Sequence, residues 1–201
     1  MKLASILPLC TALCLAVPAG AQTAPTRDPA KIQAGTYALD PDHTQVVFAV
    51  DHLGYSIYRG SFSDVTGTLE LDPKNPAAST LKVSIPVSSV ATTSPKLTDE
   101  LKGAEWLDAA KHPTMSFVST KVTMDGPDKA TVTGDFTLHG VTKPVSLQVT
   151  LVGAVPNAIT KKFSVGFEAK GRIKRSDFGV KTYVPMIGDE VDLTIAGAFD
   201  R

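Results

Sequence analysis

The chain has 201 residues and carries 20 lysines and arginines against 20 aspartates and glutamates, so its formal net charge is zero. A chain of this length is long enough for one domain with a sizeable hydrophobic core. The neutral balance and the lack of a long basic run argue against nucleic acid as a partner.

Residues 1–21 have the pattern of a secretory signal peptide. Lys2 supplies an early positive charge, residues 3–17 are mainly apolar, and Ala-Gly-Ala at 19–21 provides the small residues that a signal peptidase accepts. The apolar stretch is too short to remain as a membrane anchor, and no second long one follows. We therefore expect cleavage after Ala21, secretion, and a mature protein that does not span the membrane.

Both cysteines, Cys10 and Cys14, lie in this segment. The mature chain would then have no thiol, which excludes a disulfide framework, a zinc–thiolate site and a cysteine nucleophile. A leucine precedes each cysteine, whereas lipoprotein processing requires a small residue there. Residues 22–34 are polar, contain prolines and show no periodicity, so we expect a flexible leader before a domain that covers residues 35–201.

The first part of this domain predicts three strands. Apolar and polar residues alternate with a period of two, which is typical of strands buried on one face. Val65 and Leu69, for example, share one face, and Thr66 lies on the other. Pro86 indicates a bulge, because proline fits poorly inside a paired strand. The three predicted strands cover residues 43–52, 65–72 and 80–87.

Residues 94–111 depart from this alternation and predict one or two short helices. Ser94 is a suitable N-cap and proline follows it at the first helical position. Leu97 and Leu101 stand four residues apart on one apolar side, and Pro113 closes the segment.

The last part of the chain returns to alternation with a period of two. Short turns at 125–129 and 139–144 contain glycine and proline, and such short connections indicate antiparallel neighbours. The five strands predicted here cover residues 113–122, 131–138, 144–151, 162–173 and 190–199.

About eight antiparallel strands with one apolar face each form either a barrel or a two-sheet sandwich. An eight-stranded barrel leaves an interior that side chains fill or that holds one small ligand. Several strands are long, about 40 Å at ~3.3 Å per residue, which favours a coiled barrel. The predicted fold class is all-β, with a short helical insertion that covers one end.

Four ordered segments of the chain resemble the YceI-like family of periplasmic polyisoprenoid-binding proteins. They are residues 37–72, residues 100–117 ("ELKGAEWLDAAKHPTMSF"), residues 132–147 ("VTGDFTLHGVTKPVSL"), and residues 171–180 leading into 189–195. The resemblance covers about residues 35–199. It implies an eight-stranded antiparallel lipocalin-like barrel whose interior takes a long isoprenoid or similar lipid, often in a homodimer. This chain has Glu100 where family members frequently carry histidine, so if this position touches the polar end of the ligand, the chemistry of that contact differs here.

The inward-facing side chains are the candidate ligand-binding residues. We expect Trp106 and the helical insertion to cover or gate one end, and His52 to meet the polar head of the ligand at the mouth. His52 has a second interpretation, as a hydrogen-bonded residue that closes its strand. No cofactor is expected besides the bound lipid. The predicted ligand-binding residues are Phe48, Val50, His52, Phe62, Val83, Ile85, Trp106, Phe117, Phe136, Leu147, Phe163, Val165 and Phe167.

The four histidines give no local metal-binding pattern. His43 and His52 are about 30 Å apart in an extended strand and point to opposite faces, so they cannot share an ion. His112 and His139 have no second ligand at short spacing. We therefore predict no metal site.

Catalytic patterns are equally weak. The serines lack a G-x-S-x-G elbow, and the adjacent carboxylates look like solvated charges. The basic residues at 170–175 could attract a pyrophosphate head group, although such a run is more often a solvated strand face, and Arg175 could pair with Asp177 at the surface.

The preferred interpretation is a non-enzymatic carrier of a polyisoprenoid or quinone-like lipid. An enzyme acting on such a lipid and a stress-protective protein with a filled barrel remain alternatives. Alternating apolar residues suit both a cavity and a filled core, so the pattern alone does not separate them.

Overall fold

A computed structural model describes residues 23–201. The expected signal peptide, both cysteines and the expected cleavage site lie outside the described residues. No helix within 23–201 is long and apolar enough to cross a membrane.

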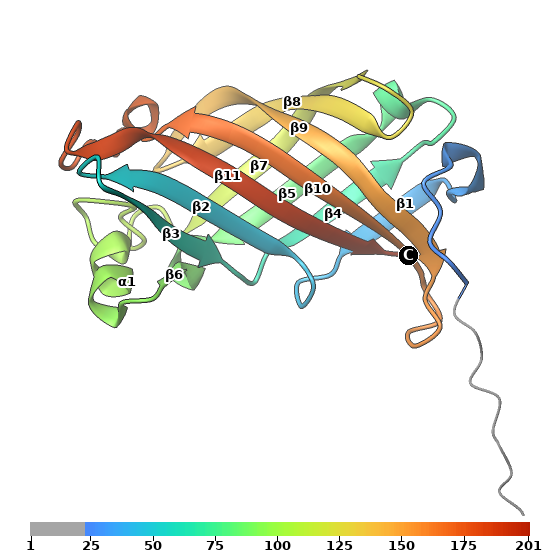
Figure 1. The fold of residues 1–201 in the computed structure, drawn as a ribbon, viewed down its shortest axis with the longest axis horizontal. Helices are drawn as coiled ribbons and strands as arrows, with labels where there is room; N and C mark the ends of the chain where they lie inside the picture. The colour runs from blue at the N-terminus through green and yellow to red at the C-terminus, as the bar shows by residue number, and fades with distance from the viewer. Residues whose placement is uncertain (1–22) are drawn as a thin grey trace, which may run out of the picture.

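The described chain folds into one antiparallel sheet that closes on itself (Figure 1). Its elements, in chain order, are β1 (Gly35–Leu39), β2 (Gln45–His52), β3 (Ser56–Phe62), β4 (Thr66–Leu71), β5 (Thr80–Pro86), β6 (Ala91–Thr92), α1 (Pro95–Lys102), β7 (Thr114–Met124), β8 (Lys129–Leu138), β9 (Val141–Pro156), β10 (Phe163–Lys174) and β11 (Ile187–Asp200). The strands follow the order β1-β4-β5-β7-β8-β9-β10-β11, and β1 pairs with β11 to close the ring. The predicted eight-stranded antiparallel barrel with a short helix is therefore confirmed.

The remaining strands are continuations of barrel strands across short breaks. β2 follows β1 and pairs with the same neighbour, β11, while β3 pairs with β2 and leads into β4, which pairs with β1. β6 extends β5 in the same way and pairs with β3. Pro86 ends β5 and is followed by a 3₁₀ turn at Val87–Ser89, so it marks a break in a strand where the sequence predicted a bulge.

Two short hairpins join the strands of the second half. Residues 125–128 connect β7 to β8, as predicted. The β8–β9 turn, predicted at 139–144, is only two residues long, because β9 already begins at Val141. His139 and Gly140 both have positive φ angles, of 51° and 74°. Such a pair is typical of the tight hairpin turn whose twist matches the twist of the flanking strands.

The two ends of the barrel are covered by different segments. α1 lies at one end beside β3 and β6, and residues 23–34 lie at the other (Figure 1). α1 begins as predicted, since the Ser94 side chain accepts a hydrogen bond from the Leu97 amide. At the far end, Thr26 exchanges backbone hydrogen bonds with Ala154 of β9, and Ile32 packs against the core.

Candidate functional site

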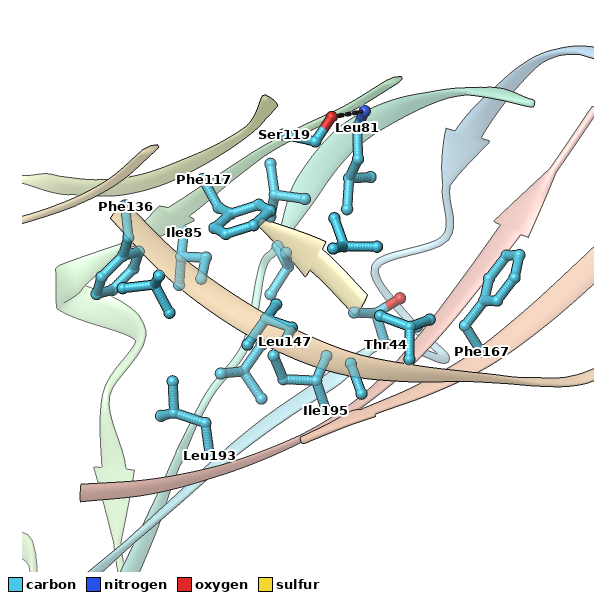
Figure 2. A pocket seen from close by; sticks show the side chains of 18 of the residues that line it. Thr44, Leu81, Ile85, Phe117, Ser119, Phe136, Leu147, Phe167, Leu193 and Ile195 are labelled. Atoms are coloured by element: carbon cyan, nitrogen blue, oxygen red, sulfur yellow. Dashed lines mark hydrogen bonds between the residues drawn. The ribbon is translucent and has the colours of Figure 1, made fainter. Parts of the chain in front are cut away.

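The barrel encloses an elongated apolar cavity of about 340 Å³. This size is within the usual range for ligand pockets, about 300–1,000 Å³. Figure 2 shows Ile85, Phe117, Phe136 and Leu147 directed into it from successive strands of the sheet, and Leu193 from β11 farther round the wall. The hydroxyl of Ser119 is on the wall but accepts a hydrogen bond from the Leu81 amide at 2.8 Å, so it is already engaged. A flexible hydrocarbon fits such a surface better than a polar solute does.

The cavity follows most of the barrel's length. On β7 its wall runs from Met115 to Met124, nine residues on. At ~3.3 Å per residue and a strand tilt of about 40°, this span corresponds to about 23 Å along the barrel axis. One end is bounded by Trp106 and Leu107 after α1, and the other by Pro29 and neighbouring turns. The shape is therefore a tunnel.

Ten of the thirteen residues predicted to bind the ligand line this tunnel. They share the inward face of regular strands, where a period of two assigns sides reliably; Trp106 alone comes from the segment after α1. The ten are Phe48, Val50, Phe62, Val83, Ile85, Trp106, Phe117, Phe136, Leu147 and Phe167.

Phe163 and Val165 are buried but do not reach the cavity wall. Their exposed fractions are 9% and 1%, and both belong to the main hydrophobic core. Val165 pairs with Phe199 of β11, and the Phe199 ring packs against Phe167 with centroids 6.1 Å apart. Phe167 and Phe199 line the cavity, whereas Phe163 and Val165 do not. The first residues of β10 therefore lie beyond the cavity, in the packed end of the barrel.

His52 also lies off the cavity wall. Its ring packs against Tyr55 and Tyr58, with centroids 5.8 and 6.3 Å apart. The register of β11 shifts between Ile187 and Val191, opposite the end of β2, so the regular alternation that placed His52 beside Val50 ends there. This position does not match the predicted contact with a head group.

The buried charged group that lines the cavity is Arg175, which the sequence suggested as a surface ion-pair partner of Asp177. Arg175 begins a 3₁₀ turn, Arg175–Phe178, directly after β10, and it is only 5% exposed. Asp177 instead lies 3.9 Å from Lys143. The inward alternation of β10 continues from Ile173 to position 175, and this continuation was the available signal for Arg175.

The guanidinium of Arg175 is held by backbone carbonyls. Its nitrogens donate to the carbonyls of Gly188, Val180 and Ile187 at 2.8, 3.1 and 2.8 Å. Burial lowers the pKa of this guanidinium, and the nearby Asp189 carboxylate acts in the opposite direction. Three of the five guanidinium N–H groups are used in this way, which leaves two for a ligand.

Trp106 joins this polar end to the helix. The Arg175 guanidinium lies 5.4 Å from the centre of the Trp106 ring, within the range of a cation–π contact. The indole nitrogen of Trp106 donates to Glu100 of α1 at 3.3 Å. Glu100, the position where the family frequently has histidine, therefore orients the tryptophan on the cavity wall.

The other basic residues of the 170–175 run face outward. Arg172 donates to Asp192 at 2.6 Å and to Glu190 at 3.0 Å, and its side chain is 58% exposed. Lys170 lies 3.4 Å from Glu168. These contacts match a solvated strand face, as the sequence favoured.

The fold also brings together two histidines that the sequence left unpaired. Possible ligand atoms of Asp108, His112 and His139 all lie within 4.8 Å of one another. The sequence showed no second ligand at short spacing for either histidine, and this proximity arises in space between segments far apart in the chain. The cause is the β7–β8 hairpin, which returns the end of β8 to the segment that precedes β7.

Comparisons with known proteins agree with this architecture. The YceI-like domain family matches residues 37–199. Protein YceI of Escherichia coli O157:H7 is 43% identical over 165 residues, which is 81% of this chain and 85% of that relative. The crystal structure of BcnA from Burkholderia cenocepacia has a TM-score of 0.71 at 25% identity and covers 80% of this chain and 98% of its own.

A polyisoprenoid binding domain from Saccharophagus degradans has a TM-score of 0.61 and covers 84% of this chain and 99% of its own. At 14% identity it shows a shared fold alone. The domain match and the E. coli relative establish the relationship. This chain belongs to the YceI-like family.

Proposed function

We propose that this protein binds a long-chain apolar lipid, a polyisoprenoid or a quinone-like molecule, inside its barrel and carries it through the periplasm. The observation that supports this most directly is the apolar tunnel of about 340 Å³ with one buried cation at one end. The S. degradans domain described as polyisoprenoid binding has the same fold, which is consistent with such a ligand.

The apolar wall favours a long tail over a short one. At ~25 cal/mol per Å², each further ~100 Å² of hydrocarbon that is buried contributes about 2.5 kcal/mol. Association costs at least about 4 kcal/mol in lost freedom of motion, and a flexible tail adds to that cost. For a ligand that fills only part of the tunnel, the free energy of burial barely exceeds the cost of association. We therefore expect affinity to rise with chain length until the tunnel is full.

The polar head of the lipid belongs at Arg175 in this proposal. Its two remaining N–H groups suit an acceptor oxygen, such as that of a hydroxyl, a quinone carbonyl or a phosphate. The ring of Trp106 beside it covers this end of the tunnel. Arg175 replaces His52 as the proposed head-group contact.

We propose binding without catalysis. The wall is almost wholly apolar, and its charged members are Arg175 at one end and Asp128 and Lys129 in the turn at the other. An enzyme acting on the lipid would need several polar groups around one reacting atom. A filled barrel fits poorly with a cavity of about 340 Å³. The periplasmic location rests on the signal-like residues 1–21 together with the family resemblance, and homodimer formation rests on that resemblance alone.

Lipid extraction tests the proposal. Protein purified from its native periplasm is analysed by native mass spectrometry and then by solvent extraction, and the stripped protein is offered isoprenoids of increasing length. We expect a co-purified lipid, and uptake that increases with chain length. No bound lipid in repeated preparations together with no uptake of added isoprenoids would refute the carrier function.

A cavity-filling variant provides the matched control. Ala169 lines the tunnel and pairs with Ile195 of β11. Thr194, the residue before Ile195, is exposed on the outer face. Ala169→Phe should fill part of the tunnel and reduce lipid uptake, and Thr194→Phe should leave uptake unchanged. Thermal unfolding of both variants verifies that they are folded. Equal uptake by both variants would place the lipid outside the barrel.

A further inference from the structure

We propose that Asp108, His112 and His139 form a binding site for a divalent metal ion of the zinc class, outside the lipid tunnel. The donor set would be two imidazole nitrogens and one carboxylate oxygen, which zinc accepts readily. Three protein ligands leave a fourth position for water or another small ligand. The site is separate from the proposed lipid function and stands on different residues.

The three side chains come from two segments that pack against each other. Asp108 and His112 are joined by a turn in which the amide of His112 donates to the carbonyl of Asp108 at 2.8 Å. His139 comes from the two-residue β8–β9 turn. The rings of His112 and His139 meet edge to face with centroids 4.7 Å apart.

The ligand atoms are near enough for an ion to bind after small side-chain rotations. They lie within 4.8 Å of one another. Tetrahedral ligands at ~2.0–2.1 Å from zinc are about 3.4 Å apart, so shifts of about 1 Å close the site. Rotation about side-chain bonds provides shifts of this size without backbone movement.

The backbone around the site is fixed in an unusual conformation. Asp108 and His139 have φ angles of 45° and 51°, in the left-handed region that residues with a β-carbon seldom occupy. A β-carbon on Gly140 would lie 2.7 Å from Cε1 of His112, and one on Gly179 would lie 3.2 Å from Nδ1 of His139. The two glycines thus let the backbone approach both rings closely and restrict where the rings can turn.

The charge at the site also suits a cation. Asp108 is 6% exposed, and its Oδ2 lies 3.2 Å from Nζ of Lys111, whose side chain is 75% exposed. Among the hydrogen bonds of residues 23–201, none is donated to Oδ1 of Asp108. A buried carboxylate with one engaged oxygen, next to two half-buried imidazoles, has a ligand position available for an ion.

The site lies beside the tunnel without opening into it. Leu107 and Leu138, the chain neighbours of Asp108 and His139, line the tunnel. A bound ion would therefore tie the segment after α1 to the β8–β9 turn at the end where Arg175 lies, and would stabilise the folded state in proportion to its occupancy.

Metal titration of the full mature protein tests the proposal. After chelator treatment and dialysis, Zn²⁺ is titrated by calorimetry and Co²⁺ by visible absorption, with and without prior lipid extraction. We expect one ion per chain, a Co²⁺ spectrum of a four-coordinate nitrogen–oxygen site, and a Tm that rises with added Zn²⁺. A failure of lipid binding leaves these readouts unaffected, so the two proposals are tested independently.

Variants identify the ligands. His112→Ala and His139→Asn, the latter chosen because asparagine tolerates a positive φ, should each weaken Zn²⁺ binding at least about tenfold. His43→Ala and His52→Ala alter histidines away from the site and should bind as the unaltered protein does. If the first pair does not fold, imidazole ¹⁵N chemical shifts of the unaltered protein should change at His112 and His139 on Zn²⁺ addition. Absence of Zn²⁺ binding, binding that persists in both ligand variants, or shifts confined to other histidines would overturn the proposal.

Discussion

Replacement of Arg175 by methionine measures how much the buried guanidinium contributes to the stability of the folded protein. Methionine is apolar and of similar length, so the change removes the guanidinium while keeping much of the packing volume. In the folded protein the guanidinium satisfies the carbonyls of Gly188, Val180 and Ile187. These carbonyls belong to the two segments that bound the end of the tunnel.

The expected loss of stability follows from those three acceptors. The bond to Val180 is buried and the other two are partly buried. An unsatisfied buried acceptor costs about 1–3 kcal/mol, and a partly buried one costs less because water reaches it. Loss of the Trp106 contact adds about 1 kcal/mol, and relief of the guanidinium's desolvation subtracts from the total. The variant should unfold with a free energy about 3 kcal/mol lower, a large part of the 5–15 kcal/mol typical of a domain.

Urea unfolding followed by circular dichroism measures this difference. Arg172→Met is the matched control, since Arg172 lies three residues earlier, is 58% exposed and pairs only with surface carboxylates. It should change the free energy of unfolding by less than about 1 kcal/mol. Equal losses of unfolding free energy for both variants, or a loss below about 1 kcal/mol for Arg175→Met, would refute the idea that the Arg175 guanidinium stabilises this end of the barrel.

Four further predictions concern the same end of the barrel. Burial acts to raise the pKa of the Asp189 carboxyl, but hydrogen bonds from the side chain and amide of Ser176 hold this pKa below its usual value. The ionised carboxylate therefore stabilises the folded state at pH values above the ordinary carboxyl pKa. This stabilisation is lost as the pH falls through the lowered pKa of the folded state. Urea unfolding from pH 7 to pH 3 should show a weaker pH dependence for Asp189→Asn, and an unchanged profile would contradict this. Trp106 is the only tryptophan of the chain and lines the tunnel, so its fluorescence should change when lipid binds and stay constant when a short polar solute is added. Glu100→Ala removes the acceptor of the Trp106 indole N–H. This change should broaden the Trp106 fluorescence lifetime distribution and weaken lipid binding a fewfold, whereas the control Glu105→Ala should change neither. Gly140→Ala introduces a β-carbon 2.7 Å from the His112 ring at a positive φ, so it should lower Tm by several degrees, measured by scanning calorimetry against Gly126→Ala, where the φ is also positive and the space is open.

Alternation of apolar and polar residues predicted most of the barrel and its wall, because strand geometry assigns sides with a period of two. Phe117, Phe136 and Leu147 lie where that rule puts them. The rule says nothing about depth along the barrel axis, and this is why Phe163 and Val165 were predicted as ligand contacts although they lie in the packed end.

The sequence was least informative where the chain leaves regular strands. Arg175 sits in a 3₁₀ turn, where a basic residue in a charged run looks like a surface residue. His112 and His139 are brought together by a hairpin, and no local spacing reports that kind of contact. The histidine contact depends on which turns meet at one end of the barrel, which strand patterns do not encode. For Arg175 the one available signal was the inward alternation of β10, continued from Ile173 to position 175.

The seam of the barrel has a consequence for how the protein is made. The ring closes only when β11, the last strand of the chain, pairs with β1 and β2 near its beginning. A chain emerging N-terminus first therefore keeps its apolar inner face and two unpaired strand edges exposed until β11 has been synthesised. A protein truncated before Ile187 lacks β11 and cannot close the ring, so it should aggregate through these exposed edges.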